Sequence, residues 1–198
     1  MKTLEKNALI QTQSFHAHFP ISTSDVIFLG DTQIKDFRWS DSLDEVSARN
    51  LGIENETTNE LFQRLESIVS QQPRLIFLQS GGSDVRQGYR LRTTRQAYQK
   101  VLTTIRQRSP QTTLVVQSIL PQGRVQATRI QSLNRSIAHW VEASGGIYVD
   151  LYTHLANAHG VLDSQYSRDE YLLLAPGYEY WLRSIKPYTS LERSCTDS

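Results

Sequence analysis

Apolar segments of strand length alternate with amphipathic segments of helix length along this chain. Strands that are apolar throughout are typical of a parallel sheet covered by helices on both faces. The sequence therefore predicts an α/β protein, a three-layer α/β/α sandwich with a five-stranded parallel sheet. The predicted strands lie in "DVIFLG" (25–30), in "VSARNLGI" (46–53), where a shorter strand is expected, and in "RLIFLQSGG" (74–82), "TTLVVQSIL" (112–120) and "IYVDL" (147–151).

The segments between these strands carry apolar residues at helical spacing. In "TTNELFQRLESIVSQQ" (57–72), for example, Leu61, Leu65 and Ile68 share one face. Further helices are expected in 93–110 with Ala97, Val101, Leu102 and Ile105 on one stripe, in 129–146 before Gly145-Gly146, and in 175–188 with Pro176 in the first turn.

Composition narrows the functional classes. The net charge of +1 in 198 residues favours neither nucleic acid nor an anionic membrane as a partner. The single cysteine, Cys195, excludes a disulfide framework and a cysteine-based zinc site, and we expect neither a metal nor a cofactor. The first 15 residues lack a hydrophobic signal core, so we expect a cytoplasmic protein. We expect one domain over 1–198, with a lead-in of about 1–20 and a polar tail at 190–198.

An open parallel sheet binds its ligand at the carboxyl ends of its strands, here after Leu29, Gln79, Leu120 and Asp150. The segments around these ends match, in order and spacing, the blocks of a known family. The chain resembles the GDSL/SGNH hydrolases, close to acylhydrolases similar to platelet-activating-factor acetylhydrolase. The resemblance is carried by "VIFLGDTQIKDFRW" (26–39), "NLGIENETTNELFQRL" (50–65), "LIFLQSGGSDV" (75–85), "VVQSILPQG" (115–123) and "YVDLYTHLANAHGVLDSQYSRDEYLLLAPGYEYW" (148–181).

The resemblance implies a flavodoxin-like strand order and assigns five functional positions. The nucleophilic serine of the family falls on Thr32, and its catalytic aspartate falls on Asp169. The oxyanion-hole glycine and asparagine fall on Asn55 and Ser83. The catalytic histidine falls on Leu172, which cannot accept a proton. Without a catalytic base, Asp169 is expected to cap the turn that leads into the last helix.

These replacements favour a catalytically inactive homologue, a pseudo-esterase. It would keep a cleft for a small acyl, glycan or anionic ligand, or for a protein partner. The alternative is a weak or unusual esterase with Thr32 as nucleophile, and His154 is the one histidine that could then serve as base. A divergent transferase is a third possibility. The sequence leaves the oligomeric state open.

One group of residues is not explained by the family pattern. The segment "DVRQGYRLRTTR" (84–95) follows the third predicted strand and carries Arg86, Arg90, Arg92 and Arg95. These arginines are either part of a solvated loop and helix start, or an anion-binding lip of the site, because arginine suits carboxylate and phosphate groups.

Overall fold

The computed structural model describes residues 14, 18–43 and 47–191, so Cys195 and His16 lie outside the described residues. One parallel sheet crosses the domain in the order β2-β1-β3-β4-β5. This is the flavodoxin order, and the predicted five-stranded sheet is confirmed. The strands are β1 (Val26–Gly30), β2 (Ala48–Gly52), β3 (Leu75–Gln79), β4 (Thr113–Gln117) and β5 (Ile147–Val149).

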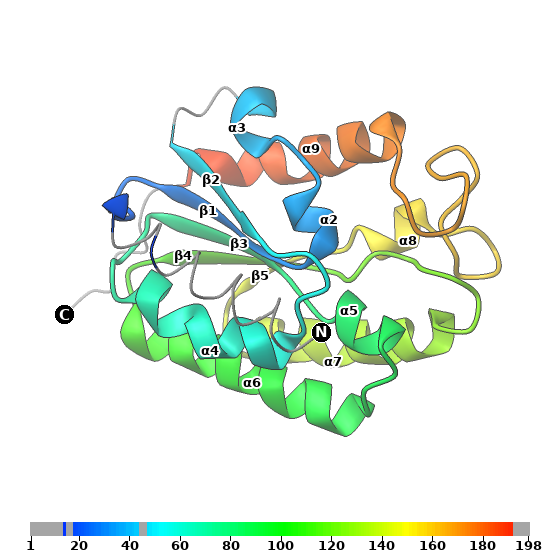
Figure 1. Cartoon of the computed structure of the whole chain (residues 1–198), viewed down its shortest axis with the longest axis horizontal. Coiled ribbons are helices and arrows are strands. Elements are labelled where there is room, and N and C mark those ends of the chain that lie inside the picture. The colour runs from blue at the N-terminus through cyan, green and yellow to red at the C-terminus, as the bar shows by residue number, and fades with distance from the viewer. Residues whose placement is uncertain (1–13, 15–17, 44–46, 192–198) are drawn as a thin grey trace.

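Helices cover both faces of the sheet, as Figure 1 shows. Alternate residues of a strand point to opposite faces, so Ile27 and Leu29 pack on one side and Val26 and Phe28 on the other. The first face is covered by α4 (Thr58–Val69), α6 (Leu91–Arg108) and α7 (Ala127–Ala143), and the second by α2 (Thr32–Lys35), α3 (Trp39–Ser42) and α9 (Ala175–Thr189). Two short helices, α5 (Gly82–Arg86) and α8 (Tyr152–Leu155), follow β3 and β5.

The helix predictions agree closely with the structure. Leu61, Leu65 and Ile68 of α4 are fully buried. Of the stripe predicted on α6, Ala97, Val101 and Ile105 are buried and Leu102 is half-buried. No helix in the described part of the chain is long and apolar enough to cross a membrane.

An aromatic cluster fills the second face of the sheet. Trp39 stacks on Phe28 with ring centroids 4.1 Å apart, and Trp181 meets Trp39 edge-on at 5.1 Å. Both tryptophans are fully buried. Tyr178 stacks on Phe37 at 4.4 Å at the edge of this cluster. These rings belong to the hydrophobic core, and their packing holds α9 and α3 against the sheet.

β4 and β5 end earlier than the sequence predicts, and β5 stops at Val149, before the last two residues of the predicted segment 147–151. β4 ends at Gln117 rather than near Leu120, because the backbone of Ile119 is bonded to the Asn134 side chain instead of to a strand. Asn134 accepts from the Ile119 N–H and donates to its carbonyl, both at 2.9 Å. The side chain of Asn134, which belongs to α7, thus holds the backbone at the point where the chain leaves the sheet.

Candidate functional site

Thr32 is presented by a tight turn at the end of β1. Gly30 closes the strand, and a Cβ there would lie 1.9 Å from the Gln79 carbonyl oxygen of β3. Only glycine allows this approach of the two strands. Asp31 is buried in the turn, and Thr32 follows half-buried as the first residue of α2.

Asp31 joins this turn to the end of β3. Its Oδ2 accepts a hydrogen bond of 3.0 Å from the Ser83 backbone N–H. Burial raises the pKa of the Asp31 carboxyl, while the Ser83 N–H and the charge of Arg86 act in the opposite direction. The Asp31 carboxylate therefore links Ser83 to the turn that carries Thr32, and it lies within the influence of the positive charge of Arg86.

Asn55 delivers a backbone donor to the Thr32 hydroxyl. It lies in the loop between β2 and α4 with φ of 60°, a left-handed conformation that glycine and asparagine tolerate best. Its N–H donates to Thr32 Oγ1 at 2.9 Å. Its carbonyl accepts from Gln87 Nε2 at 2.7 Å, which holds the loop against α5. Asparagine thus keeps the backbone geometry of the glycine expected here.

Arg86 brings a positive charge to the same place. Its Nη2 lies 2.8 Å from Asn55 Oδ1, 3.2 Å from Ser83 Oγ and 3.4 Å from Thr32 Oγ1. One guanidinium nitrogen therefore contacts the residues at three of the five positions assigned by the family resemblance. Arg86 is half-buried at the end of α5.

The other arginines of this segment do not share these contacts. Arg90 and Arg92 are exposed at the start of α6, and neither hydrogen-bonds to Thr32, Asn55 or Ser83 within the described ranges. Arg95 instead joins α6 to α7, with Nε 3.0 Å from Ser136 Oγ and Nη2 2.8 Å from Ser132 Oγ. The structure therefore brings together Arg86 and the Thr32 site, and Arg95 belongs to helix packing.

Asp169 caps a turn, as expected, but it is not the residue that caps α9. Its Oδ1 accepts from the backbone N–H groups of Leu172 at 2.7 Å and Tyr171 at 3.0 Å. These two hydrogen bonds lower the pKa of the exposed Asp169 carboxyl, and the bond from Leu172 has the larger effect. The N-cap of α9 is Leu174. The Leu172 side chain is 56% exposed, so it points into solvent rather than into the core.

His154 is held by aromatic neighbours. Its ring stacks on Tyr180 with centroids 3.7 Å apart, and its Nε2 lies 2.9 Å from the Tyr166 hydroxyl. His18, His139 and His159 are exposed. Across residues 18–43 and 47–191, no histidine hydrogen-bonds to the Thr32 hydroxyl, whose partners are the Asn55 N–H and Arg86 Nη2.

Gln122 is a site residue that the sequence did not single out. It is 3% exposed and lies over Gly82, where an added Cβ would be 2.6 Å from its Nε2. Its Oε1 is buried without a hydrogen-bond partner in the part of the chain that the structure describes. The only available signal was its place inside the fourth block of the resemblance, directly after the Leu-Pro pair.

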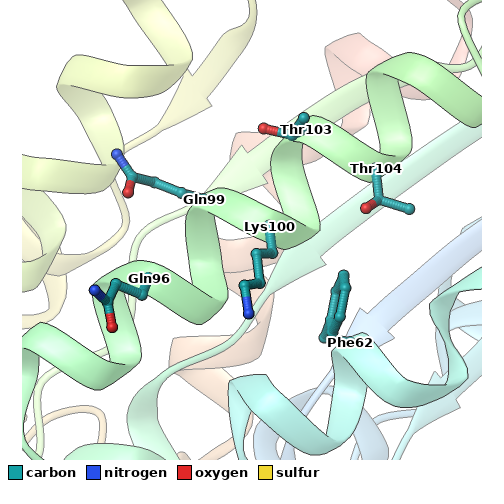
Figure 2. A pocket seen from close by; sticks show the side chains of 6 residues that line it. All are labelled: Phe62, Gln96, Gln99, Lys100, Thr103 and Thr104. Atoms are coloured by element: carbon teal, nitrogen blue, oxygen red, sulfur yellow. The ribbon is translucent and has the colours of Figure 1, made fainter.

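The groove in Figure 2 lies elsewhere, between α4 and α6. Its wall combines Phe62 with residues of α6, and Lys100 Nζ lies 5.7 Å from the centre of the Phe62 ring. It contains no nucleophile with a base. Among the residues that can be described, no group of three or more His, Cys, Asp or Glu side chains is placed to hold a metal ion.

The sheet order and the residues gathered at its carboxyl edge define an α/β domain of the SGNH-hydrolase type. Residues 31–180 match the model of the GDSL-like lipase/acylhydrolase family, and the chain belongs to this family.

Solved structures share its fold at low sequence identity. A GDSL-like lipase from Bacteroides thetaiotaomicron is 19% identical with a TM-score of 0.80, covering 91% of this chain and 96% of its own. A Streptococcus pneumoniae protein named for platelet activating factor is 20% identical with a TM-score of 0.78, over 93% and 92%. A carbohydrate esterase of family 3 from Talaromyces cellulolyticus is 15% identical with a TM-score of 0.67, over 83% and 95%. A comparison with curated proteins gave no significant match.

Proposed function

We propose that this chain is a non-hydrolysing member of the GDSL family that binds a ligand at the former ester site. The observation that carries the proposal is the set of hydrogen bonds around the Thr32 hydroxyl. Its oxygen accepts from the Asn55 N–H and from Arg86 Nη2. Both partners are donors, and no proton acceptor among the described residues hydrogen-bonds to this hydroxyl.

A threonine hydroxyl needs a base before it can attack an ester, because it is protonated at neutral pH. Arginine cannot serve, since its guanidinium stays protonated in proteins. Removing the base from a catalytic triad of this type costs about 10⁶ in kcat. Asp169 does not replace the base, because its carboxylate is engaged by the N–H groups of Tyr171 and Leu172.

The architecture that positions a ligand remains in place even so. Asp31, Asn55 and Ser83 are held by specific hydrogen bonds around Thr32. Relatives of the same fold are named as lipases and carbohydrate esterases. This supports a small acyl, glycan or anionic ligand at the site, and a protein partner that presents such a group would fit the same argument.

One observation favours a second candidate, an esterase that uses Thr32. The Asn55 N–H, which takes the place of a family oxyanion donor, lies 2.9 Å from Thr32 Oγ1. An ester bound beside Thr32 would place its carbonyl oxygen, where the negative charge develops, within reach of this donor. The candidate still requires a base that is brought to Thr32 by the ester itself or by a change of conformation.

Hydrolysis of p-nitrophenyl acetate and butyrate separates the two functions. We compare the wild-type chain with Thr32→Ala and with Thr103→Ala, an exposed threonine of α6. The proposal expects the same background rate from all three proteins. Turnover that is lost in Thr32→Ala and kept in Thr103→Ala would establish the threonine esterase instead.

A further inference from the structure

We propose that Arg86 makes this site specific for an anion, a small organic carboxylate that carries an apolar chain. The inference rests on the proposed function, and it changes the class of ligand. An esterase site of this family takes a neutral ester, whereas a guanidinium at the nucleophile favours a ligand that is already charged.

Arg86 forms no direct ion pair in the described part of the chain, although its charge acts at a distance on Asp31 and Glu54. Among the described residues, no carboxylate lies within 4.0 Å of its guanidinium. The nearest candidates are engaged elsewhere: Glu54 pairs with Lys35 at 2.8 Å, and Asp31 accepts from the Ser83 N–H.

The buried arginine of α4 shows the contrast. Arg64 is 1% exposed, and its Nε and Nη2 donate to the two carboxylate oxygens of Glu56 at 2.6 and 2.7 Å. A cation removed from water is normally paired in this way. Arg86 is half-buried and contacts only neutral oxygens through Nη2.

The groups of Arg86 and Thr32 that are left over are donors, while Gln122 contributes one buried acceptor without a partner among the described residues, Oε1. Nε and Nη1 of Arg86 donate to no protein atom in the described ranges, and neither does the Thr32 O–H, whose oxygen accepts from Asn55 and Arg86. A ligand group that meets these donors must supply acceptor oxygens. A carboxylate does so with a charge, and charge-assisted hydrogen bonds are about twice as strong as neutral ones.

Two neighbouring loops add an apolar surface. Gln122 lies over Gly82, and the Tyr171 hydroxyl lies where a Cβ on Gly123 would meet it at 2.2 Å. These contacts place the loop after β4 beside the site and the loop of Tyr171 against it. Large hydrophobic side chains are exposed in both loops: Val125 at 87%, Leu172 at 56% and Tyr171 at 42%. Because these side chains face solvent in neighbouring loops, they are free to cover the alkyl chain of a carboxylate bound at Arg86, which an inorganic anion lacks.

Asp31 and Glu54 are the negative charges that oppose anion binding, since the charge of Arg86 acts on both carboxyls. Asp31 is buried behind Ser83, and its interaction with Arg86 is not a direct ion pair. Burial raises the pKa of this carboxyl. Because Asp31 is bonded to the Ser83 N–H and does not contact the guanidinium, it competes for Arg86 less than a carboxylate in direct contact would.

The test is a titration of the full chain by calorimetry and thermal shift, at ionic strength matched with NaCl. The probes are sodium acetate, butyrate and hexanoate, with sodium phosphate as the inorganic anion and butyramide as the uncharged analogue of butyrate. We expect butyrate and hexanoate to raise the Tm as bound ligands do, with affinity increasing along the series. Butyramide should not bind. Equal binding of phosphate, or of butyramide, would overturn the proposed ligand class.

The variants locate the binding. Arg86→Gln should weaken butyrate binding about tenfold or more, the loss expected for a hydrogen bond to a charged group. Arg90→Gln, an exposed arginine at the start of α6, is the matched control and should bind as the wild type does. Unchanged binding in Arg86→Gln would overturn the proposal. If that variant fails to fold, Arg86→Lys keeps the charge without the planar fork and should bind more weakly than the wild type.

The ester assay is scored independently of this titration. Hydrolysis that depends on Thr32 would refute the non-hydrolysing function, while butyrate binding that depends on Arg86 would still stand. Absent hydrolysis together with absent carboxylate binding would leave the proposed function intact and refute this inference alone.

Discussion

The Ser83 backbone N–H donates to Asp31 Oδ2 at 3.0 Å, and this bond joins the turns that follow two neighbouring inner strands, β1 and β3. Both residues are buried. The turn that carries Thr32 and the turn that leads into α5 therefore hold one fixed spacing. Arg86, four residues after Gly82 in α5, reaches Thr32 because of that spacing.

Replacing Asp31 should therefore destabilise the domain, and the loss should be larger when the new side chain offers no acceptor for the Ser83 N–H. Asp31→Ala leaves the buried Ser83 N–H without this acceptor, and we expect the free energy of unfolding to fall by about 1–3 kcal/mol. Asp31→Asn retains an acceptor oxygen and should lose less. Urea denaturation of the three proteins measures both differences. Equal stability of Asp31→Ala and the wild type would show that the bond does not stabilise the fold.

The sequence predicts the sheet well because its strands are buried on both faces. In β1 and β3 every residue is buried, so apolar runs such as Val26–Gly30 mark them clearly. β2 is half-buried along most of its length, and its sequence, Ala48–Gly52, is correspondingly less apolar. Strand ends are predicted less well, because the end of β4 depends on Asn134, a residue of α7 that is distant in sequence.

The site is predictable only where the family pattern assigns a position. Thr32, Asn55 and Ser83 follow from the resemblance, and the structure places their side chains around one guanidinium nitrogen. Arg86 and Arg90 look alike in the sequence, yet only Arg86 lies at the end of α5 within reach of Thr32. Which arginine reaches the site is decided by the helix, and the sequence pattern does not show it.

A buried ion pair supports the loop that carries Asn55. Arg64 donates to both carboxylate oxygens of Glu56 and to the Leu51 carbonyl at 2.7 Å. Burial raises the pKa of Glu56 to about 7, and the charge of Arg64 opposes this shift. Glu56 is the neighbour of Asn55 in the chain, so the pair links α4 to the backbone N–H that donates to Thr32.

Arg64→Ala should be strongly destabilising, because it leaves Glu56 buried without its partner. We expect the free energy of unfolding to fall by about 3–5 kcal/mol. Arg108→Ala is the control, since Arg108 and its partner Glu66 are 64% and 60% exposed. An exposed pair contributes about 0–1 kcal/mol. Chemical denaturation at neutral pH compares the two variants. Similar decreases in the free energy of unfolding would mean that the buried pair stabilises the fold no more than the exposed pair does.

Asp169 should act on stability through pH rather than on catalysis. Its folded-state pKa is lowered from 3.8 by the N–H groups of Leu172 and Tyr171. A carboxyl of this kind stabilises the folded state above its unfolded pKa, and the contribution is lost as the pH falls through the folded pKa. Asp169→Asn should therefore be less stable than the wild type at pH 7, and the difference should shrink below about pH 4.

Thermal unfolding from pH 3 to pH 7 tests this expectation, with the exposed carboxylate of Asp36 as the control through Asp36→Asn. The control should follow the wild-type profile more closely than Asp169→Asn does. A difference between Asp169→Asn and the wild type that is the same at every pH would assign Asp169 a role that does not depend on its charge.

Under the proposed function, Leu172→His alone should not produce hydrolysis. The Leu172 side chain is 56% exposed, so Leu172→His fits without disturbing the core. Arg86 Nη2 would still donate to Thr32 Oγ1, and Ser83 would still stand where the family has an asparagine. Triad and oxyanion groups act as a unit, so their effects are strongly non-additive. We expect the single variant to match the wild-type background on p-nitrophenyl acetate.

The triple variant Thr32→Ser, Ser83→Asn and Leu172→His should hydrolyse this ester measurably faster than the wild type. Serine removes the methyl group that restricts the rotamer of Thr32, and asparagine supplies an amide donor to the oxyanion. The matched control carries Leu172→Gln with the same two other substitutions, which offers a polar side chain but no imidazole base. Robust turnover by Leu172→His alone would show that the loss of the base is the only damage to this site. Equal rates for the triple variant and its glutamine control would show that a histidine at this position cannot reach residue 32.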